Sequence, residues 1–436
     1  MSYFHLNLIL KGKLTVCCLL MLSVIPLNAQ REAKQIGDFK ESISLNEHLR
    51  GTKRTLQYCP DGDEFVCVNG KNRYTRALYG SHSPFRVETS DRPVFAFYNN
   101  GRGGNISFKV ILRDGTELAL DRTGYCESRY SAGKRTYYLT DPSWGKGELR
   151  ISVLALADMD GAIWRFSPSN MPKGAILRWQ HGGATGKRLS RNGDMGVDPA
   201  DCFELPAEAT DLVTGELALQ KEVYLVRGEV PEGYNVRKLY QQAEAASLAL
   251  ASHLKIETPD PYLNTLGGAL VAAADGIWDG QVWLHGAIGW RMPLSGWRAG
   301  YTGDALGWHD RARTHFDAYA ASQVTDVPNT IPHPAQDSTM NLARSEKRWG
   351  TPQYSNGYIC RNPERNNQMH HYDMNLCYMD ELLWHFNWTG DTAYVRKMWP
   401  MITRHLAWEK LNYDPDNDGL YDAYACIWAS DALYYN

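Results

Sequence analysis

One short segment gathers residue types that can recognise a hydroxyl-rich ligand. Residues 296–310 read Gly-Trp-Arg-Ala-Gly-Tyr-Thr-Gly-Asp-Ala-Leu-Gly-Trp-His-Asp. An Arg and an aspartate can hydrogen-bond vicinal hydroxyl groups, while aromatic walls exclude water. Asp304 follows Thr-Gly just as Asp391 does, so helix capping is an equal explanation of that aspartate. The segment predicts a binding site formed by Trp297, Arg298, Tyr301, Asp304 and Trp308.

A second segment, residues 414–420, alternates aspartates with other residues and ends in Asp-Gly-Leu. Oxygen ligands at every second residue can converge on one hard cation, as in the first half of a calcium loop. The twelfth position would be Ala425, which cannot supply the bidentate carboxylate of a full loop. The sequence therefore allows calcium at Asp414, Asp416 and Asp418, with a plain acidic turn as the alternative. No other cofactor is expected.

A third candidate is Asp431, which follows Trp428 and precedes two tyrosines near the end of the chain. Apolar surroundings favour the protonated form of a carboxyl group, which a general acid requires. Asp431 is therefore a candidate acid, and Trp428 a candidate wall of its pocket.

Helices must position these residues. From residue 236 to 254, apolar residues recur at three- and four-residue spacing without Gly or Pro, which predicts an amphipathic linker helix. Thr389-Gly390-Asp391 predicts the turn of a helical hairpin, because Gly can end one helix and Asp can cap the next. Further helices are expected near residues 262–277, 305–323, 373–388 and 392–411.

The first half of the chain is strand-like. Short β-rich runs between about residues 57 and 227 alternate with turn dipeptides such as Asp114-Gly115 and Asp160-Gly161. Asn69-Gly70 between two such runs predicts a tight hairpin. Many short strands without an intervening helix predict a β-sandwich.

The first 29 residues are typical of an export signal. Lys11 and Lys13 precede an apolar run that is too short to span a bilayer, and Ala29 lies at a plausible cleavage point. We therefore expect a periplasmic or secreted protein without a membrane span. A formal net charge of -3 with scattered basic residues argues against a nucleic-acid partner.

The expected fold class is α+β multidomain. The expected order is a signal peptide (1–29), a β-sandwich (30–230), a linker helix (231–257) and a partial (α/α)6 toroid (258–436).

The toroid is suggested by a resemblance. The order of elements, together with the loops Gly-Tyr-Thr-Gly-Asp (300–304), Trp-Thr-Gly-Asp (388–391) and Asp-Pro-Asp-Asn-Asp-Gly-Leu (414–420), resembles the six-hairpin glycosidases. That superfamily includes α-L-rhamnosidases, trehalases and glucoamylases. The rhamnosidase motif has an acidic residue three positions before its first Gly, where this chain has Trp297.

The resemblance implies a glycoside hydrolase that acts on a complex polysaccharide or glycan. It implies Asp431 as the first choice for the general acid and Asp304 as the second. It also implies a partner carboxylate that activates water and inverts the anomeric centre. The sugar would be held by Trp297, Arg298, Trp308 and Trp428.

The region from residue 258 to 436 holds fewer helices than six hairpins need, so a fragment of a longer enzyme with little activity of its own is expected. Two other hypotheses remain open. A polysaccharide lyase with an α/α toroid could use Tyr301, His285 and Arg298. A non-catalytic carbohydrate-binding protein would need no acid at all.

Overall fold

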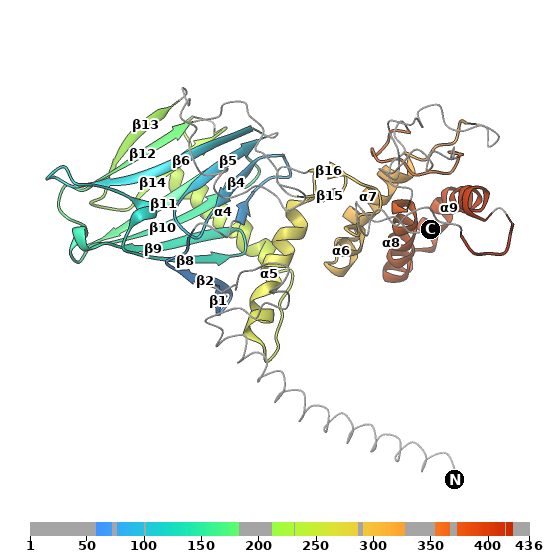
Figure 1. Cartoon of the computed structure of the whole chain (residues 1–436), viewed down its shortest axis with the longest axis horizontal. Helices are drawn as coiled ribbons and strands as arrows, with labels where there is room; N and C mark the ends of the chain where they lie inside the picture. The colour runs from blue at the N-terminus through green and yellow to red at the C-terminus, as the bar shows by residue number, and fades with distance from the viewer. Residues whose placement is uncertain are drawn as a thin grey trace, which may run out of the picture.

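The computed structural model describes residues 58–71, 76–99, 102–182, 212–230, 232–286, 291–327, 354–366, 373–414 and 416–421. These residues form two antiparallel β-sheets followed by six α-helices, which confirms the predicted α+β multidomain class (Figure 1). The predicted signal peptide, Trp428 and Asp431 lie outside the described residues.

The first sheet has the strand order β1-β2-β8-β9-β10-β11-β14. Neighbouring strands are antiparallel throughout, and the long pair β10–β11 is joined by the Asp160-Gly161 turn predicted from the sequence. The strands are β1 (Cys59–Asp61), β2 (Glu64–Val68), β8 (Tyr125–Ser131), β9 (Lys134–Thr140), β10 (Glu148–Ala155), β11 (Gly161–Ser169) and β14 (Val223–Gly228).

The second sheet has the order β13-β12-β6-β5-β4-β3, and β7 pairs with β6 beside this path. The β6–β7 turn contains Asp114 and Gly115, where Gly115 has a φ of 88°. The strands are β3 (Arg76–Leu78), β4 (Arg86–Thr89), β5 (Phe95–Asn99), β6 (Arg102–Ile111), β7 (Glu117–Ala119), β12 (Ile176–Gly182) and β13 (Val213–Ala218).

The two sheets face each other across an aromatic core. Trp164 of β11 is fully buried and makes ring contacts with Phe95 and Phe108 of the second sheet, at centroid distances of 5.5 and 6.0 Å. Phe95 also meets Tyr137 of β9 edge-on. Burying a large side chain of this kind contributes about 2–3 kcal/mol, so these rings join the sheets into the predicted sandwich.

The hairpin predicted at Asn69-Gly70 is wrong, because the flanking strands β2 and β3 lie in different sheets. Asn69 has a φ of 50°, and its backbone N–H donates to the Cys126 carbonyl at 2.8 Å. Its side-chain oxygen accepts from the Cys126 N–H at 3.0 Å. Asn69 thus extends the pairing with β8, and the chain crosses to the other sheet.

The linker helix is confirmed as α4 (Val236–Ala251), whose N-terminus is capped by the Asn235 side chain. Its buried face, including Leu239 and Tyr240, packs on Ile163 and neighbouring residues of the first sheet. Helix α5 (Pro261–Gly276) follows, with Asp260 as its N-cap and Pro at its first position. Both helices therefore lie against the sandwich (Figure 1).

The helix predicted near 305–323 is confirmed as α7 (His309–Ala320), and a short helix that was not predicted, α6 (Gly300–Ala305), precedes it. The chain turns between them because Gly307 adopts a left-handed conformation with a φ of 72°. The small pair β15 (Leu284–His285) and β16 (Met292–Pro293) precedes α6.

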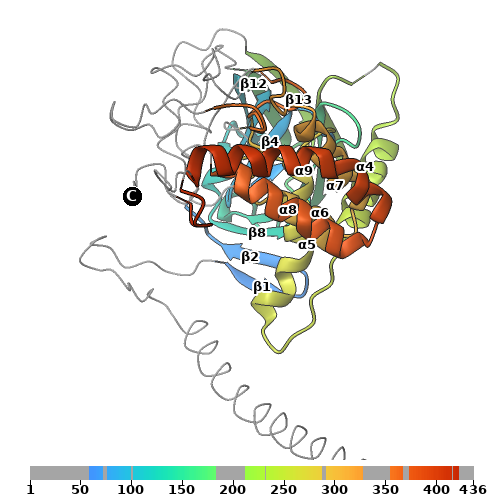
Figure 2. The ribbon, with the colours of Figure 1, turned by 90° about the vertical axis from the view of Figure 1, so that its right-hand side faces the viewer.

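The predicted helical hairpin is confirmed as α8 (Met374–Thr389) and α9 (Thr392–Tyr413). Gly390 ends α8 with a φ of 60°, and the Asp391 carboxylate accepts hydrogen bonds from the Ala393 and Tyr394 N–H groups. Figure 2 shows α8 and α9 stacked over α6 and α7. Closure of these helices into a toroid stays a prediction. Among the described residues, no helix is both long and apolar enough to cross a membrane.

Candidate functional site

The turn between β16 and α6 presents Trp297 and Arg298. The Trp297 ring packs on the His285 ring of β15 at a centroid distance of 4.0 Å. Arg298 is exposed and has a φ of 61°, in the left-handed region that costs an L-residue about 1–2 kcal/mol. A residue other than glycine keeps such a strained backbone conformation only when the surrounding structure fixes it. Strained residues of this kind cluster at active sites and ligand-binding sites.

Glu381 of α8 lies directly beneath this turn and is 1% exposed. Burial raises the pKa of Glu381 to about 8 and outweighs the backbone N–H groups of Arg298 and Gly300, which favour the charged form. A Cβ at position 300 would lie 2.5 Å from Glu381 Oε2, so glycine is needed for this close approach. Glu381 is therefore a mostly neutral carboxyl group at pH 7 that is buried beneath the turn, and neither of its oxygens has a hydrogen-bond partner among the described residues.

Tyr301 continues the same surface. Its hydroxyl donates a hydrogen bond to Asp380 of α8, which faces solvent beside Glu381. Burial, followed by this carboxylate, raises the pKa of Tyr301. The structure thus brings Arg298 and Tyr301 together with two acidic residues of α8, while Trp297, in the same turn, packs on His285.

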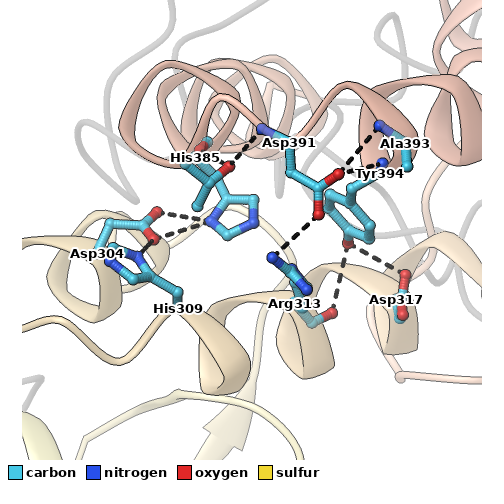
Figure 3. A network of polar contacts seen from close by, with 9 residues as sticks. Asp304, His309, Arg313, Asp317, His385, Asp391, Ala393 and Tyr394 are labelled. Atoms are coloured by element: carbon cyan, nitrogen blue, oxygen red, sulfur yellow. Dashed lines mark hydrogen bonds and ion pairs between the residues drawn. The ribbon is translucent and has the colours of Figure 1, made fainter.

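Asp304 occupies a different environment. It is 3% exposed, and its Oδ1 lies 2.7 Å from His309 Nδ1 and 2.9 Å from His385 Nδ1 (Figure 3). Its Oδ2 also lies 2.9 Å from the same nitrogen of His385. Asp304 caps no helix among the described residues, since α7 begins without a side-chain cap. The carboxylate instead joins α6, α7 and α8.

Asp391 shows that the repeated Thr-Gly-Asp sequence serves two purposes. Its Oδ1 caps α9 through the N–H groups of Ala393 and Tyr394, and its Oδ2 pairs with Arg313 of α7 at 3.1 Å (Figure 3). The hydrogen bond from the Tyr394 N–H, together with the Arg313 charge, lowers the pKa of Asp391. In the same tripeptide, Asp391 therefore caps a helix, whereas Asp304 is buried and joins three helices through contacts with two histidines.

Trp308 makes ring contacts with the segment that follows α4. The Arg311 guanidinium lies 4.4 Å from its ring centroid, and the His253 ring meets it edge-on at 5.7 Å. Arg311 in turn pairs with Asp275 of α5 at 2.7 Å. This places Trp308 at the junction of α5 and α7, and its role in sugar binding stays a prediction.

The three aspartates at the end of α9 come together as the sequence suggested. Asp414, Asp416 and Asp418 each offer a carboxylate oxygen, and these oxygens lie within 4.8 Å of one another. Asp414 is buried, whereas the other two are exposed. The donor set suits Ca²⁺, and calcium binding stays a prediction. The roles proposed for Asp431 and Trp428 also stay predictions.

Sequence reasoning missed Glu381 because an acidic pair on a helix usually faces solvent. Asp380 does face solvent, but Glu381 lies on the side of α8 that carries Tyr378 and His385. Residues three and four positions apart share one helix face. The spacing of Glu381 from Tyr378 and His385 was therefore the sequence signal that could have placed Glu381 on the buried face of α8.

Residues 100–230 match a protein family described as "Domain of unknown function (DUF4450)". No curated protein matches the chain. Among solved structures, a bacterial glucoamylase complexed with acarbose is similar over 70% of this chain, at 8% sequence identity and a TM-score of 0.39. The matched region is 56% of that glucoamylase, so this chain spans a little over half of its length.

Proposed function

We propose that this chain is a carbohydrate-active protein of the glycoside hydrolase class, exported through its first 29 residues. The observation that carries the proposal is the turn at Trp297 and Arg298. Arg298, an exposed residue with a left-handed backbone conformation, directly follows Trp297, whose indole packs on His285. Planar aromatic groups and charged hydrogen-bond donors are the groups with which proteins bind sugar rings and their hydroxyls.

The surroundings of the turn support a preformed binding surface. Glu381 is buried below it, and Tyr301 is hydrogen-bonded to Asp380 at its side. These contacts tie the turn to α8, a 16-residue helix. Side chains that are held by rigid elements lose less entropy when a ligand binds.

In the proposed reaction, a carboxylic acid protonates the leaving glycosidic oxygen while a carboxylate on the opposite face activates water. A separation of about 6.5–9.5 Å between the two groups gives inversion. Asp431 remains the first choice for the acid. Asp304 is second because both of its oxygens already contact imidazole nitrogens.

The proposal is tested by incubating the purified chain with a panel of plant and host glycans and following the products by proton NMR. Hydrolysis with inversion that is lost in Asp431→Asn supports the full proposal. Retention of configuration rejects the inverting mechanism. Products that absorb in the ultraviolet show a lyase. Binding without turnover limits the function to carbohydrate recognition.

A further inference from the structure

Asp304, His309 and His385 bring three potential metal ligands to one point. They come from α6, α7 and α8, and one ligand atom from each lies within 4.8 Å of the others. The closest separations are 2.7 and 2.9 Å, both from Asp304 Oδ1 to a histidine Nδ1. Three potential ligands from three helices thus meet without any backbone rearrangement.

Two imidazoles and one carboxylate form a donor set that suits zinc and related first-row divalent cations. Zinc bonds of about 2.0–2.1 Å in a tetrahedral site place neighbouring ligand atoms roughly 3.3 Å apart. Each histidine nitrogen must therefore move only about half an ångström away from Asp304 Oδ1 to admit the ion. The two hydrogen bonds would be exchanged for bonds to the metal.

The packing holds two of the ligands and leaves the third open to solvent. His385 is completely buried, and its ring contacts those of Phe316 and Tyr394 at 5.4 Å each. The His309 side chain is 41% exposed and lies over Asp304. An ion could therefore enter past His309, and water could occupy the coordination position on that side.

The charges around the cluster are compatible with a cation. Asp304 brings one negative charge to the ion. Arg313, the cation that Figure 3 shows in the same network, is paired with Asp391 at 3.1 Å. Tyr394 lies between this pair and Asp317, to which its hydroxyl donates.

We propose that Asp304, His309 and His385 bind one zinc-class divalent cation, with water as a further ligand. The alternative is a carboxylate that links three helices through hydrogen bonds and binds no metal. This site does not include Trp297, Arg298 or Asp431, on which the proposed sugar site depends. A metal ion bound to Asp304 would exclude that residue as the second choice for the acid. Metal binding is measured without any glycan, so the failure of either proposal can be recognised independently of the other.

The test uses the whole chain, stripped with a chelator and then titrated with ZnCl₂ by calorimetry in a buffer that contains excess calcium. Calcium occupies any site at residues 414–418. We expect one zinc ion per chain and binding in the micromolar range or tighter. The loss of an outer-shell partner typically weakens metal binding 10–100-fold, so the loss of a direct ligand should weaken it by at least ~100-fold.

His309→Ala is the main variant, because this half-exposed side chain can be removed with little effect on packing. Asp304→Asn is the second, and His253→Ala is the histidine control that should bind zinc as the wild type does. Visible spectra with CoCl₂ identify the ligands, since nitrogen and oxygen donors give no thiolate charge-transfer band. Absence of zinc binding, equal binding by His309→Ala and Asp304→Asn, or a thiolate band would each overturn the proposal.

Discussion

The buried carboxyl group of Glu381 gives the sharpest prediction about stability. Burial raises its pKa from 4.5 to about 8, so the folded protein keeps it protonated at pH values where the unfolded chain has lost that proton. The contribution of Glu381 to the free energy of unfolding is therefore greatest below pH 4.5, and it falls as the pH rises toward 8. The slope is about 1.4 kcal/mol per pH unit.

Glu381→Gln replaces the carboxyl group with a neutral amide of the same shape. A pH of 7 is 2.5 units above the ordinary glutamate pKa of 4.5. At this pH, keeping Glu381 protonated lowers the free energy of unfolding of the wild type by about 3 kcal/mol, and the variant avoids this loss. We expect the stability difference between variant and wild type to grow by about 1.4 kcal/mol per pH unit from pH 5 to pH 8.

The assay is urea unfolding at several pH values, followed by tryptophan fluorescence. Comparing each variant with wild type at the same pH cancels the titration of all other groups. Glu381→Met is the matched control. It should remove the same slope, because its side chain carries no group that titrates. A difference that does not change with pH would refute the reasoning.

Three further predictions follow from particular contacts. Arg298→Gly should raise the free energy of unfolding by about 1 kcal/mol, because glycine tolerates the left-handed conformation, and should weaken glycan binding measured by calorimetry. Unchanged stability would show that the turn is not strained. Asp391→Ala should lower the thermal midpoint through loss of the α9 cap, and Asp391→Ser should recover part of that loss; equal midpoints would contradict the capping role. Calcium should raise the thermal midpoint of the wild type but not of an Asp416→Asn, Asp418→Asn double variant, and a chelator should reverse the effect. An equal rise in both proteins would place calcium elsewhere.

Much of the fold could be predicted because local signals agreed with the final structure. The spacing of apolar residues located α4, and Gly390 with Asp391 located the α8–α9 turn to the residue. The Asn69-Gly70 signal failed because tertiary pairing outweighed it. Asn69 pairs with Cys126 of β8, and a dipeptide contains no information about such a distant partner.

The candidate site was predicted only in part. Trp297 and Arg298 lie in one turn, and Tyr301 follows at the start of α6. The environment of Asp304 could not be inferred, because His385 is 81 residues away and reaches it only after α8 packs on α6. The importance of Glu381 depends on the same packing, which buries one of two adjacent acidic residues and leaves the other exposed.

The central claim is that a sugar ring binds at the turn of Trp297 and Arg298. Its most direct test compares the binding of a glycan by Trp297→Ala and by the wild type, measured by calorimetry. Trp384→Ala is the matched control, since this tryptophan is 51% exposed on α8. A nucleic-acid base stacked on an aromatic side chain contributes about 1–3 kcal/mol, and we expect a similar contribution from a stacked sugar ring. We expect Trp297→Ala to raise the Kd about tenfold or more, while Trp384→Ala leaves it unchanged. Equal affinity of Trp297→Ala and wild type would show that sugars do not bind at this turn.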